Sequence, residues 1–187
     1  MERFDIQDGP LAGLKIIKRR SLLDSRGSFA RLFCQDEIGS LLGHKTIKQI
    51  NISVTKKRGA VRGLHFQYPP HAEDKIVCCL SGAIWDLALD LRKGSETFLK
   101  YYAIELTAEN DLAFLLPAGF AHGFQSLTSD VKVLYMHTES YTPRAEGIIN
   151  ALDPLVGIEW PCSITERSRR DRSQAFITGS FGGVVVS

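Results

Sequence analysis

The chain lacks long apolar runs and a strong net charge. No segment approaches the roughly 18 consecutive apolar residues that span a bilayer, and charges interrupt the apolar residues of positions 1–8, which argues against a signal peptide. The formal net charge is +2 over 187 residues, too small to favour nucleic acid or an acidic membrane as a partner. These features predict a cytoplasmic protein that binds neither membranes nor nucleic acid.

Cysteine is scarce, and its spacing excludes a C-x-x-C motif. The four cysteines are Cys34, Cys78, Cys79 and Cys162. The middle two are adjacent in a strand-like run, so their side chains should point to opposite faces. Free thiols in a reducing compartment are the simplest interpretation.

Sustained helical periodicity is also missing, and short strand-like runs dominate the chain. These runs cover residues 76–80, 83–91, 98–106, 112–116 and 131–138. The best helix candidate is short, at residues 35–42. We predict an all-β fold, an antiparallel sandwich or barrel with a few short helices, in a single domain over residues 1–187.

The C-terminal part is harder to interpret. Residues 165–172 (TERSRRDR) form a charge run, which is usually a solvated face. Residues 179–187 are compatible with a terminal strand or with a disordered end.

Two segments each place one histidine beside glycine and aromatic residues at the edge of a strand-like run. They are residues 62–67 (RGLHFQ), with His65, and residues 117–124 (PAGFAHGF), with His122. Histidines on neighbouring strands of a small barrel would face one cavity, where each can serve as a base, a hydrogen-bond donor or a metal ligand.

If His65 is a base, it needs a carboxylate to orient its ring. By residue type the candidates are Asp86, Asp90, Asp153 and Asp171. Arg62 lies three positions before His65 and would face the other side of a regular strand, but Gly63 makes a bulge plausible. Lys75 is placed to stabilise an oxyanion, and Tyr135 lies in a strand where it can act as an acid.

Metal chemistry is an alternative interpretation of the same segments. His65, Glu73 and His122, with His71 as a further candidate, offer nitrogen and oxygen ligands. Metal-dependent barrels of this kind usually present two histidines one residue apart on a strand, whereas Gln67 stands two positions after His65.

Ordered motifs along most of the chain resemble the dTDP-4-dehydrorhamnose 3,5-epimerase family, which consists of cupin-type jelly rolls acting on nucleotide-linked 4-keto sugars. The matching segments are residues 24–29 (DSRGSF), 49–53 (QINIS), 62–67 with 69–70 (RGLHFQ, PP), 86–92 (DLALDLR), 95–98 (SETF), 117–124 (PAGFAHGF), 135–138 (YMHT), 141–143 (YTP), 153–154 (DP) and 158–161 (IEWP). The resemblance implies a barrel core at about residues 45–161 and a tail at residues 162–187.

The resemblance also implies roles for four residues. His65 looks like the base that removes a proton next to the C4 ketone, and Asp171 like the carboxylate that orients it. Lys75 resembles the cation that stabilises the enolate oxygen, and Tyr135 the acid on the opposite face. The ketone itself is the electron sink, so the family chemistry implies neither a metal nor an organic cofactor.

Binding residues are implied in the same way. Arg62 resembles the contact to the diphosphate, for which a guanidinium fork is suited. Positions used around the sugar and nucleotide are occupied by Gln49, Asn51, His122, Tyr141 and Arg170. Arg26 and Phe29 match residues that reach the nucleotide from the neighbouring subunit, which implies a homodimer with an exchanged N-terminal segment.

The chain departs from the family pattern at several positions. Arg31 stands where an acidic residue is usual, which puts the thymine preference in doubt. Glu73 and Asp74 precede Lys75 where the family commonly has glutamine and a small residue, and these carboxylates are placed to alter its charge or position. Three alternatives therefore stay open: an epimerase of C3 or C5 alone on another nucleotide sugar, a metal-dependent cupin enzyme, and a non-catalytic sugar-nucleotide binding protein.

Overall fold

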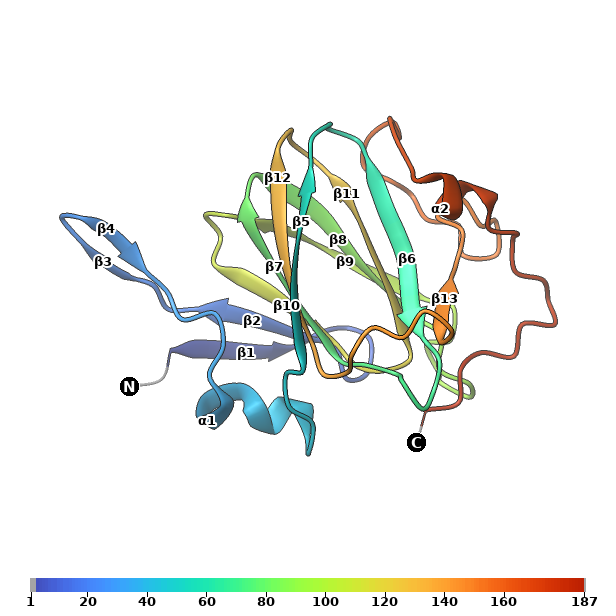
Figure 1. Ribbon diagram of the computed structural model, residues 1–187, viewed down its shortest axis with the longest axis horizontal. Coiled ribbons are helices and arrows are strands. Elements are labelled where there is room, and N and C mark those ends of the chain that lie inside the picture. The colour runs from blue at the N-terminus through green and yellow to red at the C-terminus, as the bar shows by residue number, and fades with distance from the viewer. Residues whose placement is uncertain (1–2, 187) are drawn as a thin grey trace.

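Two antiparallel β-sheets face each other and form a jelly-roll barrel in the computed structural model, which describes residues 3–186 (Figure 1). The six-stranded sheet has the order β1 (Phe4–Asp8), β2 (Lys15–Arg19), β10 (Leu112–Leu116), β7 (Lys75–Ser81), β12 (Val131–His137) and β5 (Gln49–Thr55). The five-stranded sheet has the order β13 (Glu146–Ile148), β6 (Val61–Gln67), β11 (Phe120–Ser126), β8 (Ala83–Asp90) and β9 (Tyr101–Thr107). The predicted all-β cupin-like fold is confirmed.

The strands match the sequence pattern closely, and only one boundary shifts by more than a single residue. The predicted strand at residues 98–106 begins later, because Phe98 lies in a turn and β9 starts at Tyr101. The predicted helix at residues 35–42 divides into α1 (Gln35–Ile38) and the 3₁₀ helix η1 (Gly39–Leu42). Strands β1 and β2 lie before the predicted barrel range and extend the six-stranded sheet at its edge.

Burial on both faces explains why β7 and β8 are almost continuously apolar. The inner faces of the two sheets pack together through residues such as Val77, Phe114 and Phe124. The outer face of the six-stranded sheet packs on α1 and η1 through Ile38 and Leu42. Cys79 belongs to the inner cluster and its neighbour Cys78 to the outer one, as the strand alternation predicts.

The outer face of the five-stranded sheet is covered by the C-terminal tail. Leu87 and Leu89 pack with Val184, which is buried and bridges to Arg92. Phe181 stacks on Phe98 with ring centroids 6.1 Å apart. The choice left open for residues 179–187 is therefore resolved up to residue 186: this segment docks on the barrel through one isolated bridge.

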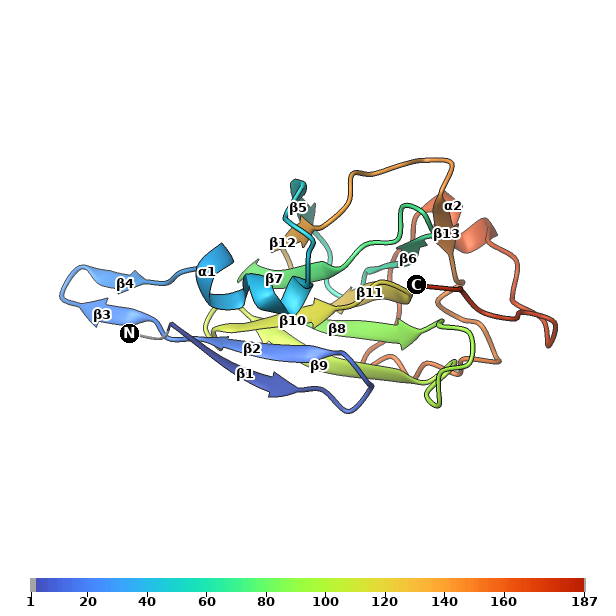
Figure 2. The ribbon, with the colours of Figure 1, turned by 90° about the horizontal axis from the view of Figure 1, so that it is seen from below.

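A short hairpin, β3 (Leu22–Asp24) and β4 (Gly27–Phe29), extends away from both sheets on the side opposite to α2 (Arg169–Ser173) (Figure 2). All of its strand residues are exposed. Within residues 3–186, no helix has the length and apolar character needed to cross a membrane.

Candidate functional site

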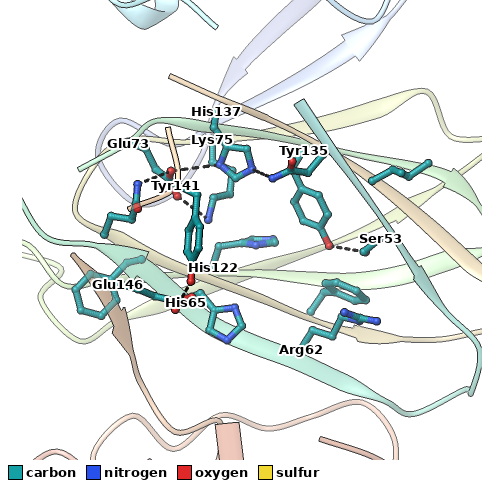
Figure 3. A pocket seen from close by; sticks show the side chains of 15 residues that line it. Ser53, Arg62, His65, Glu73, Lys75, His122, Tyr135, His137, Tyr141 and Glu146 are labelled. Carbon is teal, nitrogen blue, oxygen red and sulfur yellow. Dashed lines mark hydrogen bonds and ion pairs between the residues drawn. The ribbon is translucent and has the colours of Figure 1, made fainter. Parts of the chain in front are cut away.

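A cavity of about 250 Å³ opens between the two sheets and is lined by side chains from both (Figure 3). The six-stranded sheet and the loop before β7 contribute Asn51, Ile52, Ser53, Glu73, Lys75, Tyr135 and His137. The five-stranded sheet contributes Arg62, His65, Phe66, Gln67, His122, Phe124 and Glu146, and Tyr141 comes from the loop before β13. The cavity is therefore polar on two opposing walls.

A bulge in β6 brings Arg62 and His65 to the same cavity. The β6–β11 register shifts between the pairs His122–His65 and Phe124–Arg62, so β6 has one extra residue there. Gly63 occupies this position with φ of 117°, and a Cβ atom on it would lie 2.6 Å from the Cα of Gly123. Only glycine fits such a conformation and approach, which confirms the bulge predicted at this residue.

His65 is paired with Asp171, one of the four carboxylates that the sequence left open. Its Nε2 lies 2.8 Å from Asp171 Oδ1. Asp171 is buried in α2, where its backbone N–H donates to the Ser168 side chain at the helix start. Burial raises the pKa of the Asp171 carboxyl, but the hydrogen bond and charge interaction with His65, together with the hydrogen bonds to Ser168 and the Gly63 backbone, outweigh it and the net pKa is lowered. An ionised Asp171 favours the tautomer in which Nδ1 of His65 carries the lone pair.

A second histidine–carboxylate pair lies one strand away. His122 Nε2 is 2.7 Å from Asp86 Oδ1, and both side chains are buried. Burial raises the pKa of Asp86 and lowers that of His122, although each partner opposes the shift of the other. Asp86 Oδ2 has no hydrogen-bond partner in the described part of the chain. This pair therefore disfavours charge, in contrast to the pair around His65.

Lys75 reaches the cavity from the opposite wall, within a charged cluster. Its Nζ lies 3.2 Å from Glu73 Oε1, and Glu73 Oε2 lies 3.3 Å from His137 Nδ1. Gln67 donates to the same carboxylate at 3.1 Å. Asp74, the second carboxylate that departs from the family pattern, points elsewhere, to Lys45 and the backbone N–H of Ala118. Of these two carboxylates, only Glu73 therefore lies beside Lys75.

Tyr135 projects from β12 into the cavity and faces the wall that carries His65 (Figure 3). Its hydroxyl and that of Ser53 share a hydrogen bond of 2.9 Å. Burial raises the pKa of the Tyr135 phenol strongly. The group is consequently protonated at neutral pH and able to donate a proton.

Hydrogen bonds link two cavity residues, Tyr141 and Glu146, to α2 and to β5. The Tyr141 hydroxyl donates to Glu146 at 3.0 Å, and Arg170 pairs with the same carboxylate at 2.5 Å. The Tyr141 backbone N–H donates to the Gln49 side chain. Gln49 and Arg170 thus stand behind Tyr141 and Glu146 rather than on the cavity wall.

A basic groove of about 550 Å³ adjoins the cavity, and Arg62 and His65 line both. Its other basic residues are Lys56, Lys57, Arg167 and Arg170. Arg62 is held by Thr55 at 2.9 Å and by the Val54 carbonyl at 3.0 Å. The groove gives the site a positively charged extension suited to an anionic group.

The structure does not bring every predicted site residue into this cavity. Arg26 and Phe29 lie on the β3–β4 hairpin, exposed and remote from the cavity of their own chain. Arg26 pairs with Asp24 at 2.6 Å. Arg31, the charge reversal near them, pairs with Glu37.

Sequence reasoning missed His137 and Glu146 as cavity residues. For His137 a signal exists, because alternation along β12 puts it on the same face as Tyr135. Glu146 lies in a three-residue strand without an apolar pattern and gave no signal. The charge run at residues 165–172 is not simply a solvated face either, since it contains the buried Asp171.

The metal alternative finds no geometric support. Among residues 3–186, no three His, Cys, Asp or Glu side chains are grouped so that they can hold an ion. The Nε2 atoms of His65 and His122 are each directed to a different carboxylate.

Comparisons with known proteins agree on one group of enzymes. The model of the family described as dTDP-4-dehydrorhamnose 3,5-epimerase matches residues 8–178. An enzyme of this name from Sinorhizobium fredii is 37% identical over 175 residues, 93% of this chain and 90% of the relative.

Two solved structures are similar over almost the whole barrel. A dTDP-6-deoxy-D-glucose-3,5-epimerase from Legionella pneumophila, in complex with dTDP-4-keto-L-rhamnose, has a TM-score of 0.90 and 32% identity and covers 98% of this chain and 100% of its own. A 3'-monoepimerase from Streptomyces bikiniensis, in complex with dTDP-quinovose, has a TM-score of 0.83 and 32% identity, covering 89% and 85%.

Proposed function

Because the chain belongs to the dTDP-4-dehydrorhamnose 3,5-epimerase family, we propose that it inverts C3 and C5 of dTDP-4-dehydro-6-deoxyglucose to give dTDP-4-dehydrorhamnose. One geometric observation carries the assignment of roles. His65 and Tyr135 project from different sheets into one cavity, and Lys75 lies on the Tyr135 wall. A base and an acid on opposing walls are what inversion at carbon requires.

The reaction starts with His65, which takes the proton from C3 or C5. The electron pair of the broken C–H bond forms a double bond to C4. The C4 ketone thereby becomes an enolate whose oxygen carries the negative charge. Asp171 stabilises the imidazolium that forms, and the Lys75 ammonium stabilises the enolate oxygen.

Tyr135 completes the inversion by donating a proton to the opposite face of the same carbon. The ketone is restored, and the enzyme is left with protonated His65 and ionised Tyr135. Before the site can act on the second carbon, His65 must release its proton to solvent and Tyr135 must take one up. Tyr141 lines the cavity and is exposed, so water can reach the site beside it for this step.

The basic groove suits the diphosphate and nucleotide. Arg62 lines both the cavity and the groove, so a sugar placed at His65 brings its diphosphate next to this guanidinium. Arg170 lies in the groove behind Asp171. Among the other predicted contacts, Asn51, His122 and Tyr141 line the sugar cavity itself.

We also propose a homodimer. The β3–β4 hairpin carries Arg26 and Phe29 away from the barrel, with Leu23 and Phe29 among the most exposed apolar side chains. The edge strand β5 adds a further exposed apolar side chain, Ile50. A second copy would cover these apolar surfaces and place the hairpin at the neighbouring nucleotide. The free cysteines accord with the predicted cytoplasmic location.

Proton NMR of dTDP-4-dehydro-6-deoxyglucose with the enzyme in deuterated water tests the reaction. We expect loss of both the C3 and the C5 proton signals. Loss of one signal alone would make the chain a single-site epimerase, like the relative from Streptomyces bikiniensis named as a 3'-monoepimerase. Tight binding without exchange, repeated with CDP, UDP and GDP analogues, would contradict the proposal and favour a binding protein.

A further inference from the structure

Glu73 and His137 have no role in the reaction proposed above, yet both line the cavity beside Lys75. His137 is the direct register partner of Lys75 in the β7–β12 pair, and Glu73 comes from the loop before β7. The Glu73 carboxylate bridges the two, with Oε1 at 3.2 Å from Lys75 Nζ and Oε2 at 3.3 Å from His137 Nδ1. The three side chains form one cluster, visible in Figure 3.

The cluster is shielded from water. The side chains of Glu73, Lys75 and His137 are 9%, 10% and 12% exposed. Burial raises the pKa of the Glu73 carboxyl, but its contacts with His137 and Lys75 outweigh this and the net pKa is lowered. Glu73 is therefore an anion at neutral pH, in surroundings where charges interact more strongly than in water.

The Glu73 carboxylate weakens the stabilisation that Lys75 can give to the enolate. The carboxylate and the Lys75 ammonium together have no net charge, so the pair attracts the negative charge on the enolate oxygen only weakly. His137 offers the missing positive charge, because its Nδ1 lies 3.3 Å from Glu73 Oε2 and has no well-aligned hydrogen-bond partner within residues 3–186. A protonated ring meets the carboxylate as an ion pair.

We propose that Glu73 and His137 are a coupled pair of positioning residues, in which the His137 imidazolium offsets the Glu73 carboxylate so that the charge of Lys75 acts on the enolate oxygen. The inference rests on the proposed function and adds to it two residues that act through Lys75. It implies that His137 is required because Glu73 is charged.

The surroundings of the cluster contain few other ionisable groups. Lys75 faces the buried His122–Asp86 pair on the opposite sheet, and both of these feel its charge. His137 stacks on Tyr135, with ring centroids 6.1 Å apart, and its Nε2 lies 3.5 Å from the Asn51 amide.

A double-mutant cycle tests the coupling. The variants are Glu73→Gln, His137→Asn and both together, assayed by turnover and by deuterium exchange at C3 and C5. In the wild-type background we expect His137→Asn to lower kcat about tenfold and to change KM less than about threefold. In the Glu73→Gln background, the same substitution should lower kcat less than about threefold. If His137 were needed only for structure, adding Glu73→Gln to His137→Asn would not restore kcat.

The split between kcat and KM gives the second readout. The loss caused by His137→Asn should fall on kcat rather than on KM, because the cluster acts on the enolate oxygen through Lys75 and does not hold the nucleotide. Equal losses from His137→Asn in both backgrounds would overturn the inference while leaving the proposed function intact. Absence of exchange by the wild type would overturn both. If His137→Asn does not fold, His137→Gln replaces it in the same cycle.

Discussion

The cavity is lined by two histidines, each paired with a carboxylate, and the two pairs are alike in composition and different in environment. His65–Asp171 and His122–Asp86 have distances of 2.8 and 2.7 Å, and the two histidines are register partners on neighbouring strands. The His65 side chain is 31% exposed, whereas His122 is 7% and Asp86 0% exposed. One pair is open to substrate and water, and the other is enclosed.

This difference in exposure accompanies opposite pKa shifts of the two carboxylates. Burial raises the pKa of Asp171, but its interactions with His65, Ser168 and the Gly63 backbone together outweigh burial and lower the net pKa, so the open pair keeps an anion that can stabilise an imidazolium. In the enclosed pair, burial raises the pKa of Asp86 and lowers that of His122. Environment rather than residue type therefore decides which histidine can accept a proton during turnover.

Substitution of His65, the more exposed of the two histidines, should have the largest effect on activity. We expect His65→Asn to lower kcat by about 10²–10⁴-fold, the usual contribution of a general base. Affinity for dTDP should stay within a few-fold, because the ring is not needed to hold the nucleotide. Deuterium exchange and equilibrium dialysis measure the two quantities.

His44→Asn is the matched control, since His44 is exposed and lies outside the cavity. It should leave kcat unchanged. A His65→Asn enzyme that keeps more than about a tenth of the wild-type rate would remove His65 from its role as the base.

The fold was predictable from sequence where strands are apolar and bounded by turns. The strand at residues 112–116 is observed as predicted, because each of its faces is buried. The N-terminal strands escaped prediction because β1 is mostly exposed and alternates weakly. Such edge strands are defined by pairing with a distant segment rather than by their own pattern.

The site was predictable by residue type, and its pairings were not. By residue type the sequence offered four carboxylates for His65, and the family resemblance pointed to Asp171. The pairing itself is seen only in the structure, where Asp171 lies against His65 and Asp86 pairs with His122 instead. The link between Glu73 and His137 was hidden for the same reason, since the two residues are brought together by the β7–β12 pairing.

Stability should reveal the enclosed pair. We expect Asp86→Ala to lower the free energy of unfolding by about 1–3 kcal/mol, because it leaves the buried His122 without its hydrogen-bond partner. Asp171→Ala should lower the free energy of unfolding less, since water can reach the partly exposed His65. Urea unfolding of both variants, followed by tryptophan fluorescence, makes the comparison. A larger loss from Asp171→Ala would show that exposure does not govern these pairs.

The smallest expected effect is a difference in acid sensitivity. Because the folded-state pKa of Asp171 is lowered, its stabilisation is complete above the unfolded value of about 3.9 and is lost as the pH falls through the folded value. Because the pKa of Asp86 is raised, protonation of that group favours the folded state, and its contribution improves as the pH falls toward about 3.9. Asp171→Asn should therefore flatten the acid loss of stability, and Asp86→Asn should steepen it. Urea unfolding across the acid range measures how the free energy of unfolding of each variant changes with pH. Equal changes in the two variants would mean that the environments of Asp171 and Asp86 do not differ.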